Sequence, residues 1–203
     1  MQAAQRYLFA LVAVLVLAAC GRAPTLPKLG PHDVIVAFGD SLTRGTGASE
    51  ETAYPAVLAS LTGHTIVNAG VPGDTTASGL QRLPGVLAEY RPRLVLLCLG
   101  GNDMLRQVPA SMIENNLRLL VQTIRASGAE VVLIGVPEPR LFGGAPAFYA
   151  RVAEDMKLPL EDDVFNQVLR DNRLKSDPIH ANAAGYRVVA ERLNGFLHEA
   201  GAL

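Results

Sequence analysis

The sequence contains little of several residue types that mark particular classes of protein. Among its 203 residues are no tryptophan and only two cysteines, Cys20 and Cys98, whose surroundings differ too much to predict a disulfide framework. The 18 basic residues nearly match the 19 acidic ones, so no excess of positive charge indicates a nucleic-acid partner. The chain also lacks a GxGxxG motif and the lysine of a phosphate-binding P-loop, so no nucleotide site is predicted.

The length and composition predict one folded domain with short additional segments. Hydrophobic residues make up 49% of the chain, which excludes a wholly disordered protein. The 18 basic and 19 acidic residues are too many for a protein that crosses a membrane several times. At about 150 residues per domain, 203 residues allow one domain and little more.

The first 19 residues are predicted to be a signal peptide. They contain no acidic residue and end in an apolar run over residues 7–19. As a helix this run would reach about 20 Å, less than the ~30 Å hydrocarbon core of a bilayer, which favours a signal sequence over a membrane-spanning helix. The run closes with Leu17-Ala18-Ala19-Cys20-Gly21, which resembles the signal of bacterial lipoproteins, in which the cysteine is acylated.

Residues 20–31 are interpreted as a lipidated Cys20 followed by a flexible tether. The segment Gly21–Pro31 is rich in proline and glycine and would reach roughly 30 Å when extended. Acyl chains on Cys20 would anchor the protein to a membrane, which is therefore an expected partner. The protein would then be an exported lipoprotein that faces the periplasm. Gly21 after the cysteine resembles outer-membrane sorting signals. An ordinary secretory signal, with Cys20 incidental, is the alternative.

From residue 32 onward, segments typical of strands and helices alternate. The strand segments are continuously apolar, as in a parallel sheet covered by helices on both faces. Strands are expected at Val34–Phe38, Thr65–Asn68, Leu94–Leu99 and Val131–Val136, with a weaker one at Leu158–Leu160. Helices are expected at Tyr54–Leu61, Thr75–Tyr90, Ala110–Ser127, Ala147–Met156, Val164–Arg170 and Asn182–Glu199. This alternation predicts one doubly wound α/β domain over residues 32–203.

Polar, glycine-rich segments follow three of the predicted strands. They are Gly39-Asp40-Ser41, Gly70–Asp74 and Gly100–Asp103. In doubly wound folds the ligand binds outside the carboxyl ends of the strands, so these segments are expected to converge on one site.

Ser41 and His180 are the candidates for nucleophile and base. At the start of a helical turn, Ser41 can present both its hydroxyl and its own N–H to a reacting carbonyl. Asp177 precedes His180 by three residues, so its carboxylate can orient the imidazole and leave Nε2 free to accept a serine proton. Taken singly, Ser41 could instead be a helix cap, and an Asp-x-x-His sequence is common by chance.

Gly73 and Asn102 are candidate donors to an oxyanion. Gly73 carries no side chain, so its N–H can approach a substrate closely. Asn102 offers a neutral amide that hydrogen-bonds a developing negative charge without titrating. Glycine and asparagine are also routine in turns after strands, which is the alternative.

Together the blocks FGDS, GVPGD, GGND and DPIH, in this order, resemble those of the SGNH (GDSL) esterase and lipase family. The resemblance extends over residues 33–200 and is greatest to small bacterial periplasmic arylesterases, thioesterases and lysophospholipases. It implies a three-layer α/β/α fold with a five-stranded, parallel, flavodoxin-like sheet, and no cofactor or metal. By motif position it implies a nucleophile Ser41, a base His180 oriented by Asp177, a structural acid Asp40, and an oxyanion hole of Ser41, Gly73 and Asn102.

The expected substrates are short- to medium-chain acyl or aryl esters and thioesters, with lysophospholipids next. Apolar loop residues near the strand ends are expected to contact the acyl or aryl group, although they could equally pack beneath the loops. These residues are Met104, Leu105, Val108, Leu141, Phe142 and Ile179.

Three other functions remain open from the sequence. A carbohydrate O-acetyl esterase would use the same catalytic blocks, although aromatic residues for stacking on sugars are scarce. A metal-dependent phosphohydrolase could use Asp40, Asp74 and Asp103, but would leave Ser41 and His180 idle. A lipoprotein that kept the fold as a binding module would need none of these blocks. No oligomeric state is predicted.

Overall fold

The structure is a computed structural model that describes residues 24–139 and 143–203. Its centre is a five-stranded sheet with the strand order β2-β1-β3-β4-β5, in which all neighbours are parallel. The strands are β1 (Val34–Gly39), β2 (Thr65–Gly70), β3 (Leu94–Cys98), β4 (Glu130–Ile134) and β5 (Leu160–Glu161). This order is that of a flavodoxin-like, doubly wound sheet, and the predicted fold class is confirmed.

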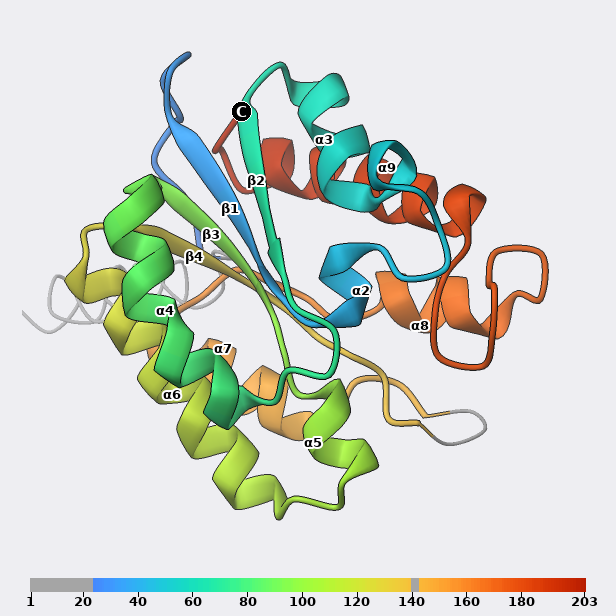
Figure 1. The fold of residues 1–203 in the computed structure, drawn as a ribbon. Coiled ribbons are helices and arrows are strands. Elements are labelled where there is room, and N and C mark those ends of the chain that lie inside the picture. Colours follow the sequence, from blue (N-terminus) through green and yellow to red (C-terminus); the bar gives the residue numbers. More distant parts are fainter. Residues whose placement is uncertain (1–23, 140–142) are drawn as a thin grey trace, which may run out of the picture.

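Helices cover both faces of the sheet. They are α2 (Ser41–Arg44), the 3₁₀ helix η1 (Glu50–Thr52), α3 (Tyr54–Thr62), α4 (Thr76–Tyr90), α5 (Gly101–Leu105), α6 (Ala110–Ala126), α7 (Ala147–Met156), α8 (Val164–Arg170) and α9 (Ala183–Glu199). On one face α9 packs against α3 and α8, and on the other α6 packs against α4 and α7 (Figure 1). Each helix expected from the sequence is present, α2 forms the helical turn expected at Ser41, and η1 and α5 were not expected.

The strands that carry the site are held in the interior. Every residue of β3 is buried, as are all residues of β1 after Val34, because helices cover both faces of these central strands. The edge strand β2 is only half-buried. In the part of the chain that the structure describes, no helix has the length and apolar composition needed to cross a bilayer.

The described part of the predicted tether packs against the domain. The N–H groups of Leu26 and Leu29 each donate to a carbonyl at the C-terminal end, Ala200 and Ala202 respectively, at 2.8 Å. Both leucine side chains are buried in the main hydrophobic core. Packing against the domain therefore begins by Leu26, six residues before the boundary predicted at residue 32. The predicted signal peptide, residues 1–19, and Cys20 lie outside the described residues.

Candidate active site

The three glycine-rich segments meet at the carboxyl edge of the sheet, as expected from the parallel topology. The first enters α2 directly after β1, and the third enters α5 directly after β3. Because β1 and β3 are neighbours in the sheet, Ser41 and Asn102 come to lie in the wall of one cavity.

Ser41 is the first residue of α2, at the sharp turn out of β1. The side chain of Asp40 caps this helix and accepts the Leu42 N–H at 3.0 Å. Gly39 allows the turn because a Cβ there would lie 2.1 Å from Thr43 Oγ1 and 2.4 Å from the Cys98 carbonyl. At this helix start the Ser41 N–H has no carbonyl from a preceding helical turn, so it is available to a ligand.

Ser41, His180 and Asp177 form a continuous hydrogen-bonded series. His180 Nε2 lies 3.0 Å from Ser41 Oγ, and His180 Nδ1 lies 2.7 Å from Asp177 Oδ2. The other oxygen of Asp177 accepts the N–H groups of Ile179 and His180, both at 2.9 Å, and so holds the turn that presents the imidazole. With Nδ1–H donating to the carboxylate, Nε2 is the acceptor for the serine proton.

The hydrogen bonds to Asp177 keep its carboxyl group ionised. Partial burial by itself raises the pKa of Asp177, but the N–H of Ile179 and the side chain and N–H of His180 outweigh it and lower the pKa. A charged carboxylate at this position stabilises the imidazolium that forms when His180 accepts a proton.

Asn102, the second residue of α5, has its amide bound within the protein. Its Nδ2 donates to the carbonyl of Asp74 at 2.9 Å and to Oδ2 of Asp40 at 3.2 Å. The longer of these bonds is the one that a substrate oxygen can replace most easily. Burial raises the pKa of Asp40 to about 6, against the opposing effects of the Leu42 N–H and His180.

Gly73 lies in the loop between β2 and α4, directly before Asp74. Its φ of 83° is in the left-handed region, which explains the glycine. Its carbonyl accepts a hydrogen bond from Arg106 at 3.0 Å, which connects this loop to the end of α5. Gly73 is not among the described residues that line the cavity beside Ser41.

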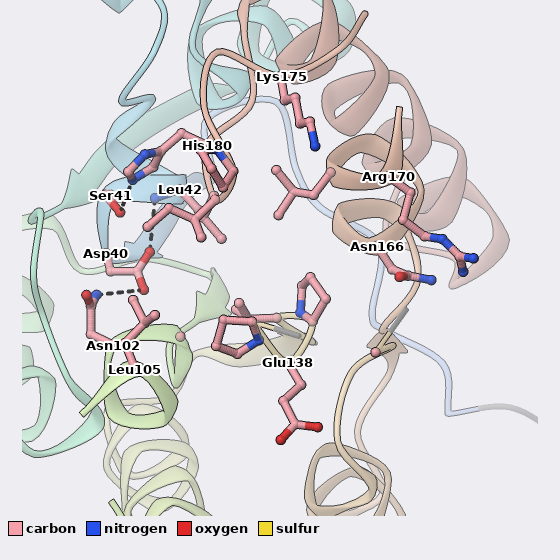
Figure 2. Close-up of a pocket in the computed structure, with 18 residues that line it drawn as sticks. Asp40, Ser41, Leu42, Asn102, Leu105, Glu138, Asn166, Arg170, Lys175 and His180 are labelled. Atoms are coloured by element: carbon pink, nitrogen blue, oxygen red, sulfur yellow. Dashed lines mark hydrogen bonds between the residues drawn. The ribbon is translucent and has the colours of Figure 1, made fainter. Parts of the chain in front are cut away.

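That cavity has a volume of about 400 Å³ and opens beside the catalytic series (Figure 2). Leu105 and Ile179, both predicted to contact substrate, line it. Met104 and Val108 do not, because they are partly buried against the hydrophobic core. This corrects their predicted role, since their apolar character is used in packing beneath the loop. Leu141 and Phe142 lie outside the described residues.

Several residues of the cavity were missed in the sequence. Apolar side chains of its lining come from separate segments: Leu42, Val136, Pro137, Pro139, Leu169 and Pro178. Asn166, Arg170 and Lys175, from α8 and the loop after it, line the wall across from Ser41 and His180 (Figure 2). Their only sequence signal is closeness along the chain to Asp177 and His180, which does not reveal that they face the catalytic wall.

The three aspartates considered as metal ligands have separate protein partners. Asp103 accepts the N–H and hydroxyl of Thr76 at 2.8 and 2.6 Å, and Asp74 pairs with Arg82. Asp40 binds Leu42 and Asn102, as described above. Among residues 24–139 and 143–203, no three histidine, cysteine or acidic side chains come together as metal ligands.

Comparison with known proteins agrees with this geometry. The model of the GDSL-like lipase/acylhydrolase family matches residues 37–188. Thioesterase 1/protease 1/lysophospholipase L1 of Escherichia coli is 34% identical over 167 residues, which cover 78% of this chain and 80% of the relative. An arylesterase of Vibrio mimicus is 32% identical over 168 residues, 77% of this chain and 84% of the relative.

The crystal structure of TesA is also similar in fold. It is 30% identical in sequence and superimposes with a TM-score of 0.71, covering 83% of this chain and 97% of TesA. The matched region contains the four sequence blocks and every described residue of the Ser41–His180–Asp177 series. The chain therefore belongs to the GDSL-like lipase/acylhydrolase family and is an ester hydrolase of the GDSL type.

Proposed function

We propose that the protein hydrolyses short- to medium-chain carboxylic esters and thioesters through an acyl intermediate on Ser41. The observation that carries this proposal is the hydrogen-bonded series from Ser41 through His180 to Asp177 at the wall of a largely apolar cavity. The names of the relatives, which include a thioesterase, a lysophospholipase and an arylesterase, support the same substrate classes. Lysophospholipids are the next candidates.

In the first half of the reaction, His180 Nε2 takes the hydroxyl proton of Ser41 as Oγ attacks the substrate carbonyl carbon. Asp177 holds the imidazole in position and stabilises its positive charge. The tetrahedral intermediate collapses as the C–O or C–S bond to the leaving group breaks. His180 gives its proton to the departing alcohol or thiol, and the acyl group stays on Ser41.

In the second half, water replaces the alcohol. His180 takes a proton from the water as its oxygen attacks the acyl-Ser41 carbonyl, and the ester bond to Oγ then breaks. The proton on His180 returns to Oγ, the carboxylic acid leaves, and Ser41 and His180 are restored.

The negative oxygen of each tetrahedral intermediate is stabilised by the Ser41 N–H, the Asn102 amide and the Gly73 N–H. Asn102 already hydrogen-bonds Asp40 and the Asp74 carbonyl. Its contribution therefore requires that the bond to Asp40 be exchanged for one to the oxyanion. Donors of this kind stabilise the transition state more than the ground state, because the oxygen gains charge as Oγ attacks.

The nucleophile is tested with a fluorophosphonate probe and mass spectrometry. Wild-type protein is expected to carry the probe on Ser41 and to lose ester hydrolysis in step with labelling. Ser41→Ala should take up no probe, whereas Ser49→Ala, a change at an exposed serine outside the cavity, should label normally. Labelling that persists in Ser41→Ala contradicts the assignment.

The substrate range is tested with p-nitrophenyl esters of increasing acyl length, a thioester series and lysophosphatidylcholine. The largely apolar cavity of about 400 Å³ predicts the highest kcat/KM for short- to medium-chain esters. Hydrolysis of acetylated xylan in preference to all of these would favour the carbohydrate esterase instead. Labelling of Ser41 without hydrolysis of any ester would contradict the proposed substrates.

We further propose that the mature protein is a lipoprotein held at the periplasmic side of the outer membrane through acylated Cys20. The sequence Leu17-Ala18-Ala19-Cys20-Gly21 supports this. Cys20→Ser is expected to move the enzyme from the membrane fraction to the soluble fraction with its esterase activity unchanged. Membrane association that survives this substitution contradicts acylation at Cys20.

A further inference from the structure

Lys175 lies on the wall of the catalytic cavity across from the reacting groups. In Figure 2 its side chain points into the space between His180 and Arg170, whereas Glu138 points away from that space. The lining of the cavity thus combines the catalytic residues, a set of apolar side chains and, across from the catalytic residues, the basic side chains of Arg170 and Lys175. A substrate that contacts all three would carry an apolar portion and a negative charge.

Within residues 24–139 and 143–203, the ammonium group of Lys175 has no charged partner. Among the residues that the structure describes, no ion pair or side-chain hydrogen bond involves it. The lysine is half-buried, so part of its hydration is already lost. An anionic ligand group can therefore bind it without displacing an acidic side chain.

The backbone around Lys175 fixes its position relative to the catalytic base. Lys175 pairs with Ala181 in an antiparallel bridge, and its carbonyl accepts a hydrogen bond from Asn182 at 3.3 Å. The Ser176 N–H donates to the carbonyl of His180 at 3.0 Å. The backbones of the lysine and the base therefore belong to one hydrogen-bonded loop, from which the Lys175 side chain extends to the cavity.

From this arrangement we propose that Lys175 selects esters that carry a carboxylate or phosphate away from the scissile bond. The inference rests on the proposed ester hydrolysis and adds the charge of the substrate to it. The anionic group can lie on the acyl side, as in a half-ester of a dicarboxylic acid. It can also lie on the alcohol side, as in an acylated glycerol phosphate.

Three matched esters test this proposal. Phenyl butyrate is the neutral reference, the phenyl half-ester of glutaric acid carries the charge on the acyl side, and a carboxyphenyl butyrate carries it on the alcohol side. Wild type is expected to hydrolyse one charged ester with a higher kcat/KM than phenyl butyrate. Whichever charged ester has the higher kcat/KM shows whether Lys175 contacts the acyl side or the alcohol side of the substrate.

Lys175→Met is expected to lower kcat/KM for the preferred charged ester by about tenfold or more, as for loss of a hydrogen bond between charged groups. Its kcat/KM for phenyl butyrate should stay within about twofold of wild type, and Lys175→Glu should turn the preference against both charged esters. Lys157→Met, at an exposed lysine outside the cavity, is the matched control and should behave as wild type.

Equal losses for neutral and charged esters in Lys175→Met would overturn the proposal, because they would mean a general disturbance of the His180 loop. A wild type that shows no preference for either charged ester would also overturn it. A different result would contradict the proposed esterase function itself: wild type would hydrolyse none of the three esters, and Ser41 would take up no fluorophosphonate.

Discussion

At the scale of single residues, local spacing explains why the Asp177–His180 pair could be predicted, whereas Ser41, 139 positions from His180, was joined to it through the resemblance of the four blocks to the family. Asp177 and His180 lie three residues apart in one turn, so their spacing alone predicts that the carboxylate hydrogen-bonds the imidazole. The role of Asp40 is different, because its burial and its contact with Asn102 depend on a residue 62 positions away. Sequence motifs indicate that an acid is needed there, whereas its raised pKa follows only from packing.

Asp40→Asn is expected to change how stability depends on pH. The pKa of Asp40 is about 6 in the folded protein and 3.8 as the ordinary value, so between these values the folded state holds the proton more tightly. Raising the pH through this window therefore destabilises wild type through this group, by about 3 kcal/mol in all. The variant lacks this loss, and its stability relative to wild type should rise by about 2 kcal/mol from pH 4 to pH 7.

Urea unfolding at intervals of pH measures this difference. Asp171→Asn is the control of opposite sign, because Arg173 lowers the pKa of Asp171 to about 2. Wild type should therefore lose stability relative to Asp171→Asn as the pH falls toward 2, not as it rises. A constant difference between wild type and Asp40→Asn across pH 4–7 would contradict the burial of a titrating Asp40.

At the scale of elements, apolar periodicity located the long helices, while the short ones needed tertiary contacts. Helix α6 buries Ile113, Leu117, Leu120, Val121 and Ile124 along one face, a pattern that can be read from sequence. Helix α2 has four residues, too few to show a period, and is stabilised by the Asp40 cap and close packing at Gly39. The predicted substrate contacts of Met104 and Val108 were wrong because an apolar side chain suits the core and the cavity equally, and both residues pack against the core.

Gly39→Ala and Gly85→Ala form a matched pair that tests the packing at the turn into α2. The methyl group added in Gly39→Ala would overlap Thr43 and the Cys98 carbonyl, so unfolding free energy should fall by more than about 3 kcal/mol. Gly85 lies on the exposed side of α4, where an added Cβ would meet no atom within 4 Å, so alanine there should stabilise the protein by about 0.5–1 kcal/mol. Thermal unfolding followed by circular dichroism measures both. Equal small effects would contradict close packing at Gly39.

At the scale of the whole molecule, the N-terminal segment is part of the domain and lies far from the site. This segment, which precedes β1, hydrogen-bonds the C-terminal residues that follow α9. Helix α9 has 17 residues and spans about 25 Å, and its other end begins next to His180. The first described residues therefore lie beside the C-terminal end of α9 and the start of β5, away from the carboxyl ends of the strands that carry Ser41 and Asn102.

Leu26→Ala tests whether this segment contributes to stability. Leu26 is buried in the core, so its truncation should cost about 2–3 kcal/mol of unfolding free energy. Lys28→Ala, two residues on and exposed, should change stability by less than about 0.5 kcal/mol. Urea unfolding of the two variants compares them directly. A free tether would instead make both substitutions neutral.

The short connection to the proposed anchor predicts which way the cavity faces. From Cys20 to Pro24 the chain can span at most about 14 Å, so an acylated Cys20 would hold the end opposite the cavity against the membrane. A Gly/Ser insertion of about 20 residues after Ala23 should raise hydrolysis of lysophospholipid in the same vesicle severalfold. Hydrolysis of a soluble ester should not change. An insertion without effect on either substrate would contradict this orientation.

By itself, the sequence determined the order of strands and helices, the three residues of the catalytic series and the family. These depend on apolar periodicity and on motifs whose members lie a few residues apart. Only the tertiary structure decided that Leu26 and Leu29 belong to the core, that Met104 and Val108 do not face the cavity, and that Lys175 does. The physical reason is that burial of a side chain depends on which distant segments cover it, and neither its own character nor that of its neighbours in the chain specifies them.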